Sequence, residues 1–408
     1  MSSPLILDIQ GSNEGLVDLA QRALSVTPFM AMEVLEAAQK LEAQGRHIIH
    51  MEVGEPDFRT PPIVVEAMNE ALSQGAFKYT HSQGHPVLRE ALSWHYQERY
   101  GLDIHPDRFL ICPGTSTGLW LLFGALLEKG DAVLMSNPHY CCYPNLVTFF
   151  GGQVLKVPVA ESEGFRFRPS ELTSYLDSRV KAILINSPAN PTGAILEPER
   201  LKGLAALGKL IISDEIYHGL SYGSDRDHTI LEYTDRAVVV GGFSKCFAMT
   251  GWRVGYMIVP PSFVRPLRSM TQNFIISVNA AVQLAAAAAL YKAWPEVEKM
   301  REIFNTRRRL LLSGLKQLGL GVMVEPEGAF YVLARANHIN PDSKSLVFDI
   351  LEKAGVGLTP GADFGSGSEG FLRFSYATSE DNIIEALSRL KTYLQGQGRP
   401  KEGSSIRL

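Results

Sequence analysis

The strongest constraint on the fold is a regular alternation of short apolar runs with longer helical patterns through the middle of the chain. Most runs are rich in Val, Ile and Leu without polar alternation, which is typical of strands buried on both faces. Helical patterns such as 115–127 and 197–207 lie between many of them. The apolar runs are 109–112, 132–135, 153–159, 182–185, 210–213, 237–241 and 255–259. The alternation predicts an α/β fold class, with a mainly parallel seven-stranded sheet flanked by helices.

The pattern changes in the last quarter of the chain, and 408 residues exceed the usual span of one compact core. The elements expected there are a long helix, a strand over 329–334, a helix over 346–354, a strand over 371–376 and a helix over 381–394. We therefore expect a large domain over 51–295 and a smaller α+β domain over 296–396, which the helical segment 15–50 joins. The polar or Gly/Ser-rich segments 1–14 and 397–408 are expected to be tails.

Composition excludes several classes of partner and site. The net charge of −4 provides no general affinity for nucleic acid, and the run Arg307, Arg308 and Arg309 is expected on a solvated helix face. The four cysteines show no C-x-x-C spacing, so neither a metal site nor a disulfide framework is predicted, and reduced thiols in a cytoplasmic protein are expected. We find no pattern of a signal peptide or membrane span, so no membrane partner is expected either.

Two segments place polar groups where predicted strands end. After the run 109–112, a loop of small residues opens a helix at Thr115 and Ser116. Exposed N–H groups and hydroxyls at a helix N-terminus suit an anion, although ordinary helix capping explains the same residues. Asn190 lies in a Pro-rich turn beyond the run 182–185, at the sheet edge where ligands of α/β proteins bind.

Two further strands end in charged residues. Asp214 follows the run 210–213, where its carboxylate is partly desolvated and needs a partner, either a structural salt bridge or a cationic cofactor. Lys245 follows the run 237–241, with Ser244 before it and Arg253 after it. An amine at the mouth of an apolar strand has conditions that lower its pKa, which suits Schiff-base chemistry, whereas an isolated strand-end lysine is usually solvated. Together, the loop at Thr115 and Ser116, the turn at Asn190 and the strand ends at Asp214 and Lys245 offer the groups that one phosphate-bearing cofactor would require.

In these motifs and their order, the sequence resembles the class I/II aminotransferases, which are fold-type-I enzymes dependent on pyridoxal 5′-phosphate (PLP). The resemblance is carried by the segments GEPDFRTP, SPANPTG, SDEIY, FSKCFAMTGWRVGY and FLRFSYA, and it covers roughly residues 20–395. It implies the two-domain architecture expected above, a PLP cofactor, and transfer of an amino group between an amino acid and a 2-oxo acid.

The resemblance implies catalytic roles for three residues. Lys245 would hold PLP covalently and move the substrate proton, and Asp214 would keep the pyridine nitrogen protonated, which makes the ring an electron sink. Tyr217, together with Asn190, would hydrogen-bond the phenolic oxygen of the ring.

The resemblance also implies how the rest of PLP is bound. Tyr140 would stack on the ring, with Tyr143 as the less favoured alternative. Tyr79 would reach the phosphate of a neighbouring subunit, which implies a homodimer with shared active sites. The phosphate ligands would be Thr115, Ser116, Ser244 and Arg253.

The substrate α-carboxylate would be bound bidentately by Arg373, with Gly54 and Asn190 completing the clamp. Aspartate-specific relatives include proteins with a lysine in the phosphate-loop helix, and residues 115–117 contain none. We therefore expect a neutral or hydrophobic amino donor, although Arg59 or a residue of a partner subunit could bind a second carboxylate.

Two alternatives stay open at this point. The same fold and lysine support β-elimination at a carbon–sulfur bond, and also aminocyclopropane synthesis. Domains of this kind also occur in transcription regulators fused to a helix-turn-helix, but residues 1–20 are too few for such a module and the net charge is negative.

Overall fold

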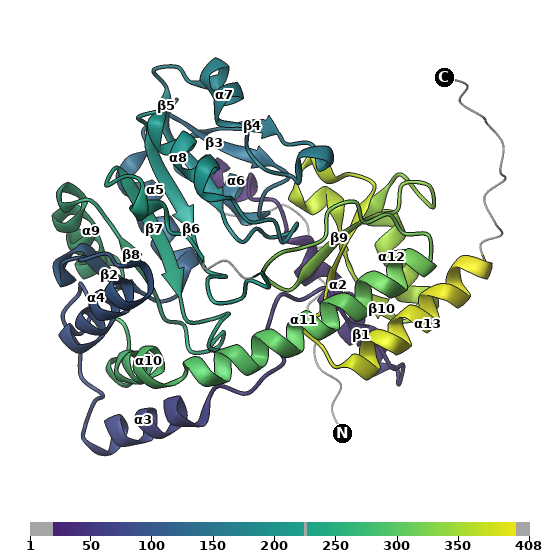
Figure 1. The fold of residues 1–408 in the computed structure, drawn as a ribbon, viewed down its shortest axis with the longest axis horizontal. Coiled ribbons are helices and arrows are strands. Elements are labelled where there is room, and N and C mark those ends of the chain that lie inside the picture. Colours follow the sequence, from purple (N-terminus) through teal and green to yellow (C-terminus); the bar gives the residue numbers. More distant parts are fainter. Residues whose placement is uncertain (1–18, 224–226, 397–408) are drawn as a thin grey trace.

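The structure is a computed structural model that describes residues 19–223 and 227–396. The expected tails 1–14 and 397–408 lie outside the described residues. A large sheet with helices on both sides fills the left and centre of Figure 1, and a group of helices and short strands lies to its right.

All seven apolar runs form strands of a single sheet, in the order β2-β8-β7-β6-β5-β3-β4. The strands are β2 (Phe109–Cys112), β3 (Ala132–Asn137), β4 (Gln153–Pro158), β5 (Val180–Asn186), β6 (Leu210–Asp214), β7 (Ala237–Gly242) and β8 (Gly255–Ile258). β3 to β7 pair in parallel, and β8 is antiparallel to β2 and β7. The predicted mainly parallel α/β sheet is therefore confirmed.

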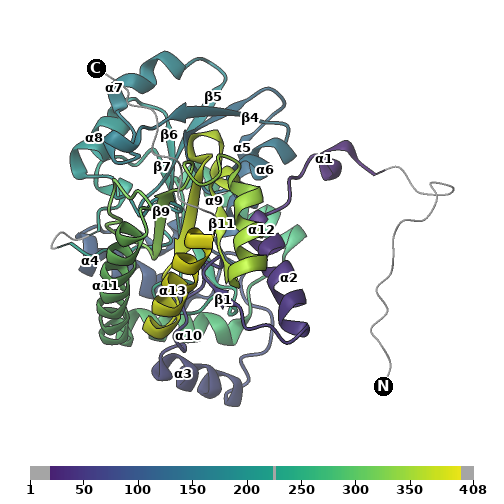
Figure 2. The same ribbon diagram turned by 90° about the vertical axis from the view of Figure 1, so that its right-hand side faces the viewer.

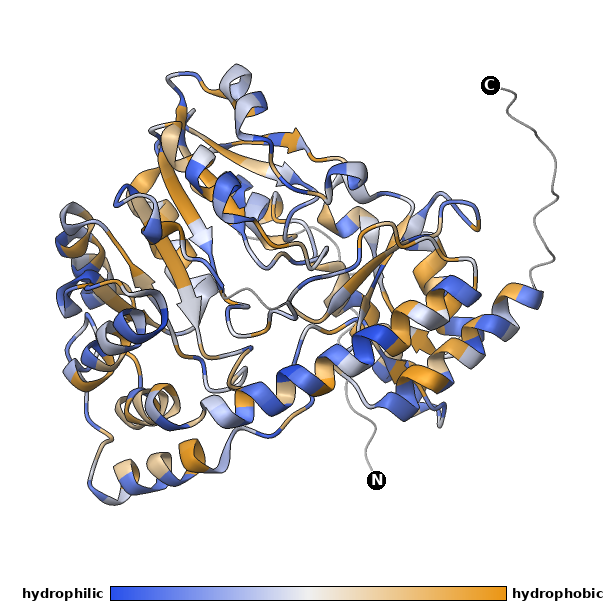
Figure 3. Ribbon diagram, viewed as in Figure 1, coloured by the Kyte–Doolittle hydropathy of each residue, from blue (hydrophilic) through white to orange (hydrophobic). Residues whose placement is uncertain are grey.

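Apolar side chains on both faces explain why these strands lack polar alternation. In β7, Val239 packs into one core cluster, whereas Val238 and Val240 pack into another. The strands of this sheet accordingly stand out as hydrophobic in Figure 3. The helices around the sheet are α3 (Pro62–Ser73), α4 (Pro86–Tyr100), α5 (Thr115–Leu126), α6 (Cys142–Phe149), α7 (Pro169–Leu172), α8 (Pro198–Ala206), α9 (Pro261–Phe274) and α10 (Ala280–Lys292).

The C-terminal part of the chain contacts the segment that precedes the large sheet. β1 (Ile49–His50) pairs in parallel with β10 (Val356–Gly357), and α2 (Met30–Ala43) lies beside α12 (Ser343–Ala354), as Figure 2 shows. The remaining elements are α1 (Gln21–Leu24), α11 (Trp294–Gln317), β9 (Tyr331–Arg335), β11 (Thr359–Pro360), β12 (Phe371–Ser375) and α13 (Glu380–Gly396). β12 pairs antiparallel with both β11 and β9. The domain boundary proposed between 295 and 296 falls in the first turn of α11 and stays a prediction.

The expectation of a solvated arginine run is wrong for Arg307. Its side chain is buried, forms an ion pair with Asp57 at 2.7 Å, and lies over the rings of Phe58 and Phe304. Burial is tolerated because the carboxylate and the two ring faces replace the solvent around the guanidinium.

The other composition-based expectations concern membranes and thiols. No helix within 19–223 and 227–396 is long and apolar enough to cross a membrane. All four cysteines are free thiols.

Candidate active site

A cavity of about 270 Å³ lies where the parallel strands β5, β6 and β7 end, and it gathers nearly all of the predicted site residues. The predicted residues in its wall are Gly54, Thr115, Ser116, Tyr140, Asn190, Asp214, Tyr217, Ser244, Lys245, Arg253 and Arg373. Tyr79 is the exception, because its side chain lies outside this cavity and is 81% exposed. The carboxyl ends of parallel strands share one sheet edge, which explains why residues far apart in sequence meet here.

The amine of Lys245 is buried in this cavity and donates a hydrogen bond of 2.6 Å to the backbone oxygen of Gly54. Burial lowers the pKa of Lys245 from 10.5 to about 8; the Glu55 carboxylate opposes this shift, and the guanidinium groups of Arg373 and Arg253 reinforce it. With a pKa of about 8, roughly a tenth of the amine is neutral at pH 7, far more than at the ordinary value of 10.5, and a nucleophile or proton acceptor requires this neutral form.

Asp214 ends β6 with its carboxylate buried at the cavity wall. Oδ2 accepts a hydrogen bond of 2.7 Å from the hydroxyl of Tyr143, and Oδ1 accepts one of 3.2 Å from the backbone N–H of Ile216. Burial raises the pKa of Asp214 from 3.8 to about 6, although the Tyr143 hydrogen bond opposes the rise. A cationic ring nitrogen bound beside it would offset the cost of the buried charge.

Tyr143 is a functional candidate whose hydrogen bond to Asp214 the sequence did not predict. Its ring is fully buried and meets the ring of Tyr140 edge-on, with centroids 5.2 Å apart. Both tyrosines line the cavity, and the hydroxyl of Tyr143 donates its hydrogen bond to Asp214. Its position on α6, three residues after Tyr140, was visible in the sequence, but the direction of its hydroxyl was not.

Whereas Asp214 favours a cationic group, the start of α5 provides hydrogen-bond donors that favour an anion. Gly114, the N-cap residue, has no side chain to cap the helix, so the first N–H groups lack intrahelical partners at the cavity wall. The guanidinium of Arg253 lies so close that a Cβ atom added at Gly114 would collide with it. These N–H groups, the Arg253 charge and the hydroxyl of Ser244 form a donor set that fits a phosphate dianion.

Arg373 is buried in β12, with its guanidinium held in place on several sides. Nη1 donates to Oδ1 of Asn190 at 3.0 Å, and Nη2 donates to Oγ1 of Thr359 at 3.0 Å and to the backbone oxygen of Glu52. The rings of Tyr331 and Phe364 flank it at 4.5 and 5.0 Å. Its Nε is buried and has no hydrogen-bond partner within the described part of the chain. A positioned guanidinium with a free donor suits a substrate carboxylate.

Tyr331 is a second residue that sequence reasoning missed. Its hydroxyl lies 2.8 Å from that of Tyr217, and both rings are buried. Glycine is required at Gly54, because a Cβ atom there would collide with the Tyr331 hydroxyl. No motif in the sequence links Tyr331 to the cavity, since it comes from β9 in a distant part of the chain.

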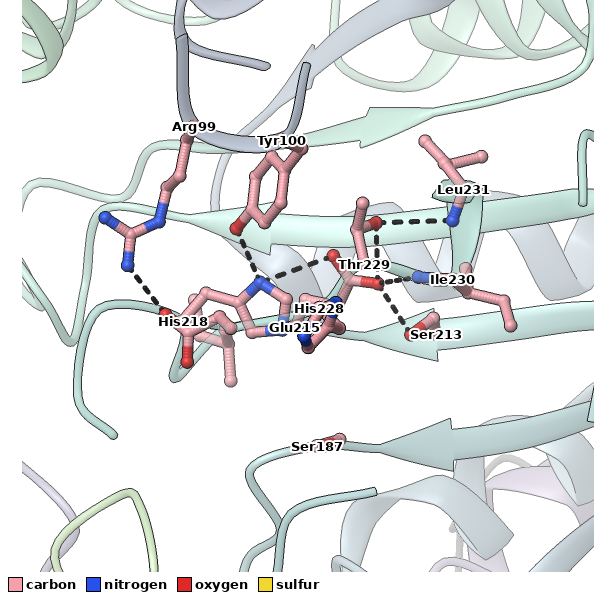
Figure 4. A network of polar contacts seen from close by, with 12 residues as sticks. Arg99, Tyr100, Ser187, Ser213, Glu215, His218, His228, Thr229, Ile230 and Leu231 are labelled. Carbon is pink, nitrogen blue, oxygen red and sulfur yellow. Dashed lines mark hydrogen bonds and ion pairs between the residues drawn. The ribbon is translucent and has the colours of Figure 1, made fainter. Parts of the chain in front are cut away.

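A buried polar network supports the segment that carries Asp214 and Tyr217 (Figure 4). The adjacent Glu215 accepts hydrogen bonds of 2.9, 3.0 and 3.1 Å from Ser213 Oγ, Thr229 Oγ1 and the Ile230 N–H. Nδ1 of His218 lies 3.5 Å from Oε2 of Glu215 and 2.7 Å from the hydroxyl of Tyr100. Residues 214 and 217 therefore serve the cavity, while 215 and 218 fix the same turn to the protein interior.

Comparisons with known proteins agree with this geometry. A sequence model of the family described as aminotransferase class I and II matches residues 46–390. A (5-formylfuran-3-yl)methyl phosphate transaminase of Methanocaldococcus jannaschii is 38% identical over 380 residues, covering 92% of this chain and 99% of the relative. A valine–pyruvate aminotransferase of Mycobacterium tuberculosis is 34% identical over 390 residues, covering 94% and 100%. The solved structure of an aspartate aminotransferase from Thermus thermophilus with maleate is 38% identical and has a TM-score of 0.88, covering 92% of this chain and 100% of that one.

Proposed function

Since this chain belongs to the class I and II aminotransferases, which are PLP-dependent transferases, we propose that it moves the amino group of a neutral or hydrophobic L-amino acid to a 2-oxo acid in two half-reactions. The main support for a neutral or hydrophobic amino donor is the set of charged side chains in the cavity wall. Among the described residues of that wall, the basic side chains are Lys245, Arg253 and Arg373. Lys245 would bind the cofactor, Arg253 its phosphate and Arg373 the substrate α-carboxylate. These described wall residues therefore leave no cation for a second substrate carboxylate.

The rest of the wall favours the same substrate class. Glu55 adds a negative charge, which would repel a second carboxylate. Arg59 lies in a separate groove beside α11 and does not line this cavity. The apolar side chains in the wall are Phe29, Ala31, Met32, Val53, Leu119, Leu146 and Ile216. An uncharged side chain of the substrate would gain from contact with this surface.

The residues of the cavity fit PLP, and each has a proposed task. Lys245 would hold the cofactor covalently, Asp214 its ring nitrogen, and Tyr217 with Asn190 its phenolic oxygen, while Tyr140 would stack on the ring. The phosphate would be bound by Thr115, Ser116, Ser244 and Arg253. When bound, PLP supplies an electron sink for the charge that develops at the substrate Cα.

The protein residues would bind the amino acid and move its proton. Arg373, in the cavity wall, would bind the α-carboxylate bidentately, and the N–H of Gly54 and the amide of Asn190 would complete the clamp. Nζ of Lys245 would then take the proton from Cα as a general base and return it as a general acid. A pKa of about 8 suits both directions of this transfer at neutral pH. Fixing the Cα–H bond relative to this amine lowers the entropic part of the barrier.

We also propose that the active protein is a homodimer in which Tyr79 completes the site of the partner subunit. Tyr79 and the nearby Phe77 are 81% and 74% exposed, between α3 and α4. Large exposed aromatic side chains are typical of residues that become buried on association. Sedimentation should give the mass of a dimer. Tyr79→Phe should weaken binding of the PLP phosphate while the dimer stays intact. A monomeric active protein would contradict this assignment.

A substrate panel tests the proposed donor class. The holoenzyme should transfer the amino group of alanine, methionine or phenylalanine to a 2-oxo acid with kcat/KM at least about tenfold above that for aspartate, the ratio expected from one unpaired carboxylate. A preference for aspartate would overturn the donor class and would indicate a cation from the partner subunit. Cystathionine that yields pyruvate and ammonia without any oxo acid would instead indicate a carbon–sulfur lyase.

A further inference from the structure

Two adjacent thiols lie beside the active-site cavity, Cys142 in its wall and Cys141 buried next to it, and the proposed transamination uses neither. Cys142 lines the cavity and is the first residue of α6, and Cys141 is the N-cap residue of that helix. Their sulfur atoms lie 3.9 Å apart, within hydrogen-bonding distance for thiols. Along the chain, the pair lies between Tyr140 and Tyr143, which both line the cavity.

The surroundings make Cys142 the more acidic member of the pair. The thiol of Cys141 and then the hydroxyl of Tyr140 hydrogen-bond to it and lower its pKa, and the N-terminus of α6 favours the thiolate. Burial raises the pKa of the other two cysteines, Cys112 and Cys246, to about 12. The chain therefore contains two inert thiols as internal controls for one reactive thiol.

We propose that Cys141 and Cys142 form a site of oxidation by peroxides that enter the substrate cavity. The Cys142 thiolate attacks the O–O bond of hydrogen peroxide, which gives a sulfenic acid and releases hydroxide. The Cys141 sulfur then attacks the Cys142 sulfur and expels the sulfenic oxygen as water, which gives a disulfide between adjacent residues. In total, two thiols lose two electrons to one peroxide, and two molecules of water form.

The disulfide would disturb the active site in a reversible way. Adjacent Cα atoms across a trans peptide are about 3.8 Å apart, below the roughly 4.4–6.8 Å that disulfides normally span. Closing the bond therefore moves the start of α6, which carries Tyr143 and its hydrogen bond to Asp214. A disulfide under such strain is readily reduced by small thiols.

The test exposes the holoenzyme to hydrogen peroxide and follows both activity and the masses of the cysteine peptides. Activity should fall as the peptide with residues 141 and 142 loses two hydrogens, and dithiothreitol should restore it, while Cys112 and Cys246 stay reduced. Cys142→Ser removes the reactive thiol, so it should keep its own starting activity under peroxide conditions that inactivate the wild-type enzyme. Cys141→Ser should form no disulfide, so that its Cys142 passes on to sulfinic acid and dithiothreitol no longer restores activity.

Three results would overturn the proposal. The first is oxidation of Cys112 or Cys246 before Cys142. The second is inactivation of Cys142→Ser at the wild-type rate, which would place the damage at another residue such as a methionine. The third is formation of the disulfide with full activity retained.

Discussion

The hydrogen bond from Tyr143 to Asp214 provides the sharpest quantitative prediction. Tyr143→Phe removes one hydroxyl and leaves a buried carboxylate that has lost its 2.7 Å donor. A hydrogen bond to a charged group contributes about 1.5–3 kcal/mol, and one pKa unit equals about 1.4 kcal/mol. In the cofactor-free cavity, the pKa of Asp214, which burial already raises to about 6, should therefore rise by a further ~1–2 units. The carboxyl would then be largely protonated at neutral pH and would no longer stabilise a positive ring nitrogen.

The assay is the pH dependence of kcat for the PLP-loaded enzyme. We expect kcat of Tyr143→Phe near neutral pH to fall by about 10- to 100-fold, with recovery toward alkaline pH where Asp214 ionises again. Tyr222→Phe is the matched control, because its buried hydroxyl bonds to Tyr376 and the backbone of Ala329, away from the cavity. A wild-type kcat and pH profile for Tyr143→Phe, or an equal loss in the control, would refute the reasoning.

Three further predictions follow from the same site. Arg373→Lys keeps the charge but loses the fork that binds a carboxylate, so KM for the amino acid should rise by about 100-fold with a smaller change in kcat, measured by steady-state kinetics. The rate at which PLP combines with cofactor-free protein should rise with pH and level off above about 8, because burial lowers the pKa of Lys245 to that value, and a rate still rising at pH 10 would contradict it. In cofactor-free protein, the folded-state pKa of Asp214 is raised from 3.8 to about 6, so its contribution to stability is present at low pH and is lost as pH rises through 6. The free energy of unfolding should fall by about 3 kcal/mol in total, of which about 1 kcal/mol is lost between pH 5 and 7. Urea unfolding of Asp214→Asn should not show this pH-dependent loss.

The sequence allowed site residues to be predicted where a charged residue directly follows a buried strand. The run before Asp214 and the run before Lys245 have no polar alternation, and both proved to be interior strands, β6 and β7. Since parallel strands end at one edge, the strand pattern alone predicted that these two side chains share a cavity. Arg373 was accessible only through the family resemblance, because its strand belongs to a different sheet.

The features that the sequence did not predict depend on how distant segments pack. Whether the Tyr143 hydroxyl points to Asp214 depends on how α6 sits against β6, which no local pattern records. The charged run around Arg307 predicts a solvated side chain. In the structure, Asp57, 250 residues away in sequence, pairs with Arg307 in the interior. Tyr331 comes from β9 and meets Tyr217 only in the folded chain.

The proposed function depends on Lys245 as the residue that holds PLP, and borohydride reduction followed by peptide mapping can identify that residue. Reduction of the PLP-loaded protein fixes the cofactor permanently to whichever amine holds it. We expect the added pyridoxyl phosphate mass on Lys245 and its loss in Lys245→Ala. Label on another lysine, or undiminished label in that variant, would contradict it.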